Sequence, residues 1–238
     1  MSQLSFVIMA GGKGVRMGSS TPKPLREIAG TSMLERVVSA ARDLPAEKVI
    51  VVAGSVAVKT EAARLGCETA WQDDPLGTAD ALAKALPFCF DEGEVIVTCA
   101  DVPLITSGIF RELYKKNSCE KSYITLLTAE APDPSGYGRV IRSSGSVVRI
   151  VEEKEASPEE KAVKVINSGV YCMKRRGLER YLSKVERSPV KGEYYLTDLV
   201  HIAIEAGERV GETGCDWRLV QGVNTPEQLL AAEQLLKA

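Results

Sequence analysis

Apolar residues in the first half of the chain follow two alternating patterns. Leu4–Met9, Lys48–Ala53 and Glu94–Thr98 are nearly continuous apolar runs, as expected of strands buried on both faces of a parallel sheet. Met33–Ala41 and Thr78–Leu86 instead repeat apolar residues at helical spacing. This alternation predicts an α/β protein with a Rossmann-like, doubly wound and mostly parallel sheet.

The middle of the chain is richer in β-forming residues and turns. Residues 140–142 and 147–151 flank the turn-forming sequence SSG and predict a hairpin. We therefore expect a β-rich insertion at about 130–175 that covers one end of the sheet. Further along, the pattern predicts helices over 175–186, 194–207 and 226–237 and a short strand over 218–222. No internal repeat or linker interrupts the pattern, which predicts a single domain over residues 1–238.

Composition and charge narrow the class of protein. The 238 residues are 45% hydrophobic and 26% charged, with a formal net charge of -2, which argues against nonspecific binding to nucleic acid or to an acidic membrane surface. No apolar stretch approaches the ~20 residues of a membrane span, and no secretory signal is evident. The six cysteines form no CxxC motif, and we expect reduced thiols in a cytoplasmic protein.

Ligands of open α/β sheets bind beyond the carboxyl ends of the strands, so the segment after the first strand is the first candidate site. Gly11, Gly12 and Gly14 allow backbone N–H groups to approach a phosphate closely. Arg16 and Lys23 can add fixed positive charge. The third glycine of a dinucleotide fingerprint and the GK[ST] of a Walker loop are both missing. The remaining alternatives are an anion-binding loop and a flexible glycine turn.

Three further strand ends carry polar side chains. The amide of Gln72 could match the imide edge of a pyrimidine base, although a loop glutamine beside a helix capped by Thr78 is an equal alternative. Asp101 follows an apolar strand, where a carboxylate can bind Mg²⁺ together with phosphate oxygens. Asp101 could instead cap a helix, although we favour the metal-binding role. For Asn224, which precedes a proline-started helix, capping is favoured on sequence grounds alone.

The middle segment adds polar groups at the ends of its strands. Gly138, Glu152 and Asn167 could line a pocket for a hydroxyl-rich ligand. The only histidine, His201, stands in a helical segment without a second candidate ligand or nucleophile nearby, and we interpret it as structural or exposed. No Ser–His–Asp or Cys–His arrangement is supported.

Taken in order, these segments resemble a known family. The loop MAGGKGVRM…PKPL resembles the signature of sugar-phosphate nucleotidyltransferases. The motifs after it stand in the same order as in bacterial N-acetylglucosamine-1-phosphate uridyltransferases: GTA, ADVPL, GYGRV, IVEEKEA, INSGVY, GEYYLTD and GVNTPEQ. The resemblance covers nearly the whole chain. It implies that UTP and N-acetylglucosamine 1-phosphate are converted to UDP-N-acetylglucosamine and pyrophosphate, with small molecules as the only partners and Mg²⁺ as cofactor.

The resemblance also implies a role for each matching residue. The catalytic cations would be Arg16 and Lys23, and the metal ligands would be Asp101 and Asn224. The sugar side would consist of Gly138, Glu152 and Asn167. The nucleotide side would consist of Ala10, Gly11, Gly12, Gly14, Lys23, Gln72, Gly77, Thr78 and Ala79.

Two departures from the family pattern bear on function. Cys99 and Ala100 precede Asp101 where an aromatic residue and glycine are common, which affects the sugar side. No segment resembles the family's C-terminal left-handed β-helix, so the chain is either a standalone uridyltransferase or a domain excised from a bifunctional protein, and the sequence leaves both alternatives open. Two rival functions remain: a nucleotidyltransferase for another nucleotide or sugar phosphate, and a catalytically silent nucleotide-sugar binding protein. The sequence leaves the oligomeric state open.

Overall fold

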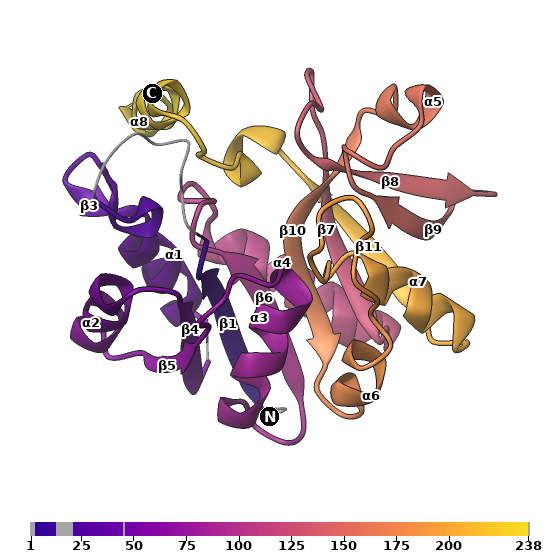
Figure 1. The fold of residues 1–238 in the computed structure, drawn as a ribbon, viewed down its shortest axis with the longest axis horizontal. Helices are drawn as coiled ribbons and strands as arrows, with labels where there is room; N and C mark the ends of the chain where they lie inside the picture. The colour runs from indigo at the N-terminus through magenta and orange to yellow at the C-terminus, as the bar shows by residue number, and fades with distance from the viewer. Residues whose placement is uncertain (1–2, 13–20, 45, 238) are drawn as a thin grey trace.

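The computed structural model describes residues 3–12, 21–44 and 46–237. In these residues, nine strands form one sheet, whose main path runs in the order β11-β7-β10-β6-β1-β4-β5 (Figure 1). The strands of this sheet are β1 (Leu4–Ala10), β4 (Lys48–Ala53), β5 (Glu68–Trp71), β6 (Glu94–Cys99), β7 (Ile124–Glu130), β8 (Gly138–Ser143), β9 (Ser146–Val151), β10 (Val165–Lys174) and β11 (Val210–Cys215). A separate small ribbon pairs β2 (Glu27–Ile28) with β3 (Thr31–Ser32).

Helices connect the strands and close the chain. They are α1 (Met33–Arg42), α2 (Val56–Arg64), α3 (Thr78–Ala85), α4 (Ser107–Glu120), α5 (Pro158–Lys161), α6 (Leu178–Leu182), α7 (Asp198–Glu205) and α8 (Pro226–Lys237). The 3-10 turns within the described ranges are η2 (Lys23–Leu25), η3 (Leu86–Phe88) and η4 (Trp217–Val220). No helix among the described residues is long and apolar enough to cross a membrane.

The order of the strands reverses beside β1. From β1 the chain continues outward to β4 and β5, and it then returns to place β6 on the other side of β1. These four strands are parallel to one another. β10 is antiparallel to β6 and β7, and β11 runs parallel to β7. The mostly parallel, doubly wound sheet is therefore confirmed. The reversal makes the carboxyl ends of β1 and β6 the expected position of a ligand.

Hydrophobic side chains alternate between the two faces of the sheet. In β1, Phe6 and Ile8 belong to one core with α1, α2 and α4, and Val7 and Met9 belong to the other core with α3, α6 and α7. The continuous apolar pattern of β1 follows from this, because both faces of the strand are covered. Figure 1 shows α3, α6 and α7 in front of the sheet.

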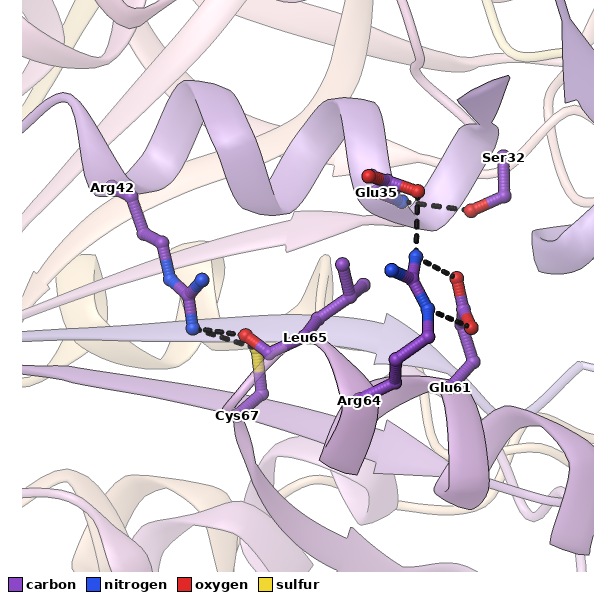
Figure 2. Close-up of polar contacts among 7 residues, drawn as sticks. All are labelled: Ser32, Glu35, Arg42, Glu61, Arg64, Leu65 and Cys67. Atoms are coloured by element: carbon purple, nitrogen blue, oxygen red, sulfur yellow. Dashed lines mark hydrogen bonds and ion pairs between the residues drawn. The ribbon is translucent and has the colours of Figure 1, made fainter. Parts of the chain in front are cut away.

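Helices α1 and α2 are also joined by polar contacts (Figure 2). Arg64 of α2 forms an ion pair with Glu61 at 2.8 Å and reaches Glu35 of α1 at 2.7 Å. The hydrogen bond from Arg64 holds the pKa of Glu61 below its ordinary value. The Ser32 side chain caps α1 by accepting from the backbone N–H of Glu35 at 3.1 Å. These contacts fix the helices that follow β3 and β4.

The hairpin β8–β9 branches from the main sheet at the end where the strands β1 and β6 terminate. β8 pairs with the first part of β10, where Gly138 lies opposite Asn167. A register shift in β10 between Asn167 and Tyr171 accompanies this branch, and Gly169 within it has a φ of 76°. In Figure 1 the hairpin and α5 extend beyond the sheet, with α5 above the hairpin and α7 below it.

The prediction was wrong at the last strand. Residues 217–220 form the 3-10 turn η4, because the Asp216 side chain accepts from the backbone N–H of Arg218 at 3.0 Å. The strand in this region is β11 at Val210–Cys215, an edge strand with two glycines and little apolar pattern. The helices predicted over 175–186 and 194–207 are also shorter, at Leu178–Leu182 and Asp198–Glu205.

Candidate active site

Two cavities lie at the carboxyl ends of β1 and β6. The larger, of about 500 Å³, is lined among others by Gly11, Gly12 and Gln72. The smaller, of about 180 Å³, lies toward the hairpin and is lined by Gly138 and Asn167. Four residues line both cavities, which therefore adjoin and are treated together as one cleft in two parts: Met9, Thr78, Cys99 and Glu152.

Lys23 connects three segments that are far apart in the sequence. Its ammonium contacts Asp101 Oδ2 at 2.5 Å and Asn224 Oδ1 at 2.8 Å. The Lys23 side chain is only 14% exposed, so the ammonium is held between two oxygens with limited access to water. Asp101 also lines the larger cavity. The site therefore combines the Lys23 ammonium with two oxygen atoms that accept from it at the edge of the cleft.

The capping alternatives for Asp101 and Asn224 are resolved by this geometry. α4 is capped by Thr106, whose hydroxyl accepts from the backbone N–H of Ile109. At α8 the capping contacts are reciprocal: the Thr225 hydroxyl accepts from Gln228 N, and the Gln228 side chain accepts from Thr225 N at 3.1 Å. Asp101 and Asn224 are thus not required as caps, and their oxygens face Lys23 instead.

Gln72 lies at the base of the larger cavity and is 4% exposed. Its Nε2 donates to Gly77 O at 3.2 Å and to Asp80 Oδ2 at 2.7 Å, which uses both amide hydrogens. The carbonyl Oε1 lies against Gly11, where an added Cβ would be 2.5 Å away. Gln72 therefore offers an acceptor beside the first loop.

The turn into α3 is built around Gly77 and Thr78. Gly77 has a φ of 121°, and an added Cβ would lie 2.3 Å from Tyr194 O. Thr78 does not cap α3; its hydroxyl accepts from Leu196 N at 2.9 Å. The backbone N–H of Ala79 donates to Tyr194 O at 3.0 Å. These contacts hold the segment 194–196 against the larger cavity, which Tyr195 lines.

Acidic and amide side chains mark the other end of the cleft. Glu152 Oε1 accepts from the Thr197 hydroxyl at 2.9 Å, and Asn167 Nδ2 donates to the Tyr171 hydroxyl at 2.7 Å. Burial raises the pKa of Glu152, with Asp198 adding to the rise. This end is rich in hydrogen-bonding groups and carries negative rather than positive charge.

Four of the predicted residues that the structure describes line neither cavity: Ala10, Lys23, Ala79 and Asn224. Ala10 and Ala79 are buried beside the cleft, at 5% and 3% exposure, and Lys23 reaches its lining through the contact with Asp101. Gly14 and Arg16 lie outside the described residues. His201 is exposed and contacts Glu205 at 3.1 Å, one helical turn away. All six cysteines are free thiols.

Several residues that line the cleft were not predicted from the sequence, and four of the polar ones are Tyr137, Glu193, Tyr195 and Thr197. Three of them stand in the motif GEYYLTD. The helix predicted over 194–207 would have placed this motif in regular structure, but α7 begins only at Asp198. The residues before it instead line the cleft, where burial and nearby carboxylates raise the pKa of Tyr195 to about 12.

The donor set fits a hard divalent cation. Mg²⁺ typically takes one or two protein oxygens and completes its shell with water and phosphate oxygens. Asp101 and Asn224 supply two oxygens that converge on the ammonium of Lys23. The ammonium takes the position between these oxygens that a metal ion would need. Among the described residues, no group of three or more His, Cys, Asp or Glu side chains forms an alternative centre.

The fold and the cleft define an α/β protein of the Rossmann-like, nucleotide-sugar transferase type. The family described as MobA-like NTP transferase domain matches residues 6–151, from β1 to the end of β9. This chain belongs to that family.

Curated relatives extend the similarity to almost the whole chain. "Bifunctional protein GlmU" of Pelotomaculum thermopropionicum is 42% identical over 98% of this chain and 52% of its own length. The protein of the same name in Caldanaerobacter subterraneus is 41% identical over 100% of this chain and 52% of its own length. The one in Desulfotalea psychrophila is 37% identical over 98% of this chain and 70% of its own length. The chain thus spans about half the length of the first two relatives.

Proposed function

We propose that this chain is a uridylyltransferase that converts UTP and N-acetylglucosamine 1-phosphate to UDP-N-acetylglucosamine and pyrophosphate. A phosphate oxygen of the sugar phosphate bonds to the α-phosphorus of UTP, and the bond from that phosphorus to the oxygen that bridges the α and β phosphates breaks. The electron pair leaves with the pyrophosphate. The family match and the GlmU relatives support this reaction.

The observation that carries the proposal is the meeting of Lys23, Asp101 and Asn224 beside a two-part cleft. The sugar phosphate is itself an anionic nucleophile, so the reaction needs no protein nucleophile. It needs positioning of two anions and neutralisation of charge at the transferred phosphorus. A buried ammonium next to two oxygen ligands provides positive charge at this place.

The larger cavity suits the uridine part of UTP. Because both amide hydrogens of Gln72 are engaged, Oε1 remains to accept the imide N–H of uracil. Cytosine presents an acceptor at that position, which this oxygen would repel. Gly11 and Gly12 would admit the triphosphate close to the backbone.

The smaller cavity suits the sugar. Glu152 can accept from sugar hydroxyl or amide groups, and Asn167 offers both an acceptor and a donor. Gly138 suits the wall of this cavity because an added Cβ would lie 3.0 Å from Ile150 Cγ2 and 3.7 Å from Asn167 Cβ. The negative charge of Glu152 at this end also directs the phosphate of the sugar toward Lys23.

Asp101 and Asn224 would hold Mg²⁺, which would neutralise phosphate charge and orient the triphosphate. Lys23 would then contact phosphate oxygens and stabilise the charge that develops as pyrophosphate leaves. We expect Lys23→Ala to lower kcat far more than it raises the KM for sugar phosphate. Near-wild-type turnover would remove Lys23 from the catalytic residues. Arg16 remains a predicted second cation.

The experiment that tests the proposal is a pyrophosphate-release assay with Mg²⁺ across UTP, CTP, GTP and dTTP and several sugar 1-phosphates. We expect the highest kcat/KM with UTP and N-acetylglucosamine 1-phosphate. Preference for another pair would reassign the substrates within the family. UTP binding without turnover of any sugar phosphate would favour a catalytically silent binding protein.

A further inference from the structure

Tyr137 joins the sugar side of the cleft to the loop that carries Asn224. It lines the smaller cavity, and its hydroxyl accepts a hydrogen bond from the backbone N–H of Gly222 at 3.0 Å. The two residues are 85 positions apart in the sequence. Tyr137 therefore forms a direct link between the connection that precedes β8 and the loop that precedes α8.

The tyrosine is held from its own side by a buried arginine. The Arg139 guanidinium donates to Tyr137 O and forms an ion pair with Glu153 at 2.6 Å. The same Glu153 carboxylate accepts from the backbone N–H of Gly136 at 3.3 Å. The Arg139 side chain is only 2% exposed. These contacts fix the backbone on both sides of Tyr137, so the position of its hydroxyl, which accepts from Gly222 N, is fixed as well.

Gly222, which donates to the Tyr137 hydroxyl, also contacts the side-chain amide of Asn224. The carbonyl of Gly222 accepts from Asn224 Nδ2 at 3.4 Å, and the amide's other end, Oδ1, faces Lys23. The next residue, Val223, donates its N–H to Asp101 O at 2.8 Å. The loop before Asn224 is therefore pinned at two consecutive N–H groups, one by Tyr137 and one by the segment of the other proposed metal ligand.

We propose that Tyr137 is a positioning residue that orients Asn224 as a metal ligand through the Gly222 peptide. The inference rests on the proposed function, since it assigns the metal to Asp101 and Asn224. Because the same residue lines the sugar cavity, Tyr137 couples the shape of the sugar side to the geometry of the metal site. Burial raises the pKa of Tyr137, which keeps the hydroxyl protonated.

The test is Tyr137→Phe, which keeps the ring and removes the acceptor. Mn²⁺ binding to the full chain with UTP is measured by water-proton relaxation, with no sugar phosphate present. Loss of one such hydrogen bond is worth about 0.5–1.5 kcal/mol, so Mn²⁺ affinity should fall roughly three- to tenfold. Tyr123→Phe is the matched control, because its buried hydroxyl also bonds to backbone, at Arg176 O, outside the cleft. It should leave Mn²⁺ affinity unchanged.

A double-mutant cycle separates positioning from other roles. In the Asn224→Ala background, Tyr137→Phe should cause no further loss of Mn²⁺ affinity. Unchanged affinity in the single variant, an equal loss in both backgrounds, or no Mn²⁺ binding by the wild type would overturn the inference. A protein that shows the Tyr137 dependence but turns over no sugar phosphate would contradict the proposed function and leave this inference standing.

Discussion

Replacing Gly11 with alanine should disturb the nucleotide side through Gln72. An added Cβ would lie 2.5 Å from Gln72 Oε1, closer than real Cβ atoms approach, and Gln72 is 4% exposed and cannot swing into water. Its displacement would strain or break the hydrogen bonds to Gly77 O and Asp80. Overpacking of this kind costs about 1–3 kcal/mol, which corresponds to a Tm lowered by roughly 2–12 °C at this chain length.

The same substitution should weaken UTP binding by roughly three- to tenfold, because the proposed hydrogen bond between Gln72 Oε1 and uracil would be misplaced. Thermal unfolding and calorimetric titration with UTP measure the two effects. Gly12→Ala is the matched control for stability, because its Cβ would meet no atom of the described residues within 4 Å. Equal Tm values for Gly11→Ala, Gly12→Ala and wild type would refute the packing argument.

Three further substitutions follow from the site. Gln72→Glu would place a carboxylate oxygen near 2.7 Å from Asp80 Oδ2, and we expect a lower Tm and loss of UTP binding in calorimetry. Lys23→Met removes the ammonium that occupies the two oxygen ligands, so Mn²⁺ affinity of the nucleotide-free chain should rise several-fold in a relaxation titration. Glu152→Gln should raise the KM for sugar phosphate at least tenfold, while its Tm at neutral pH should equal or exceed that of the wild type.

The expected Tm of Glu152→Gln follows from the direction in which the pKa of Glu152 is shifted. Its folded-state pKa is raised, mainly by burial. The folded state therefore binds this proton more tightly than the unfolded chain, and stability falls as pH rises from the unfolded to the raised folded value. The Glu152→Gln variant would lack this pH-dependent loss, so its Tm advantage should disappear in acid. For the wild type, the KM for sugar phosphate should rise as pH falls through the raised pKa.

The central sheet could be predicted from the sequence because burial on both faces leaves a continuous apolar pattern. β1, β4 and β6 are the clearest cases. β11 could not be predicted in the same way, because an edge strand with two glycines and half-exposed residues has no such pattern. The apolar residues of η4 instead suggested a strand, although a hydrogen bond to the Asp216 side chain selects a 3-10 turn.

The position of Asp101 was predictable because it follows the buried strand β6, whereas the strand before Gln72, β5, is an edge strand with a single buried residue and gives a weaker signal. Sequence alone could not decide between capping and ligation for Asn224, since that choice depends on where Thr225 and Gln228 direct their side chains. It also gave no sign that Lys23 would meet Asn224, because a contact across 201 positions arises only from the folded sheet.

Transfer of a uridylyl group to a sugar phosphate in this cleft is the step on which the proposed function depends. ³¹P NMR of one mixture of the chain, UTP, N-acetylglucosamine 1-phosphate and Mg²⁺ follows every phosphorus in that step at once. We expect UDP-N-acetylglucosamine and pyrophosphate to appear in equal amounts as both substrates disappear, and Lys23→Ala to slow both signals together. Unchanged UTP, or UMP and pyrophosphate without any nucleotide sugar, would contradict the proposed reaction.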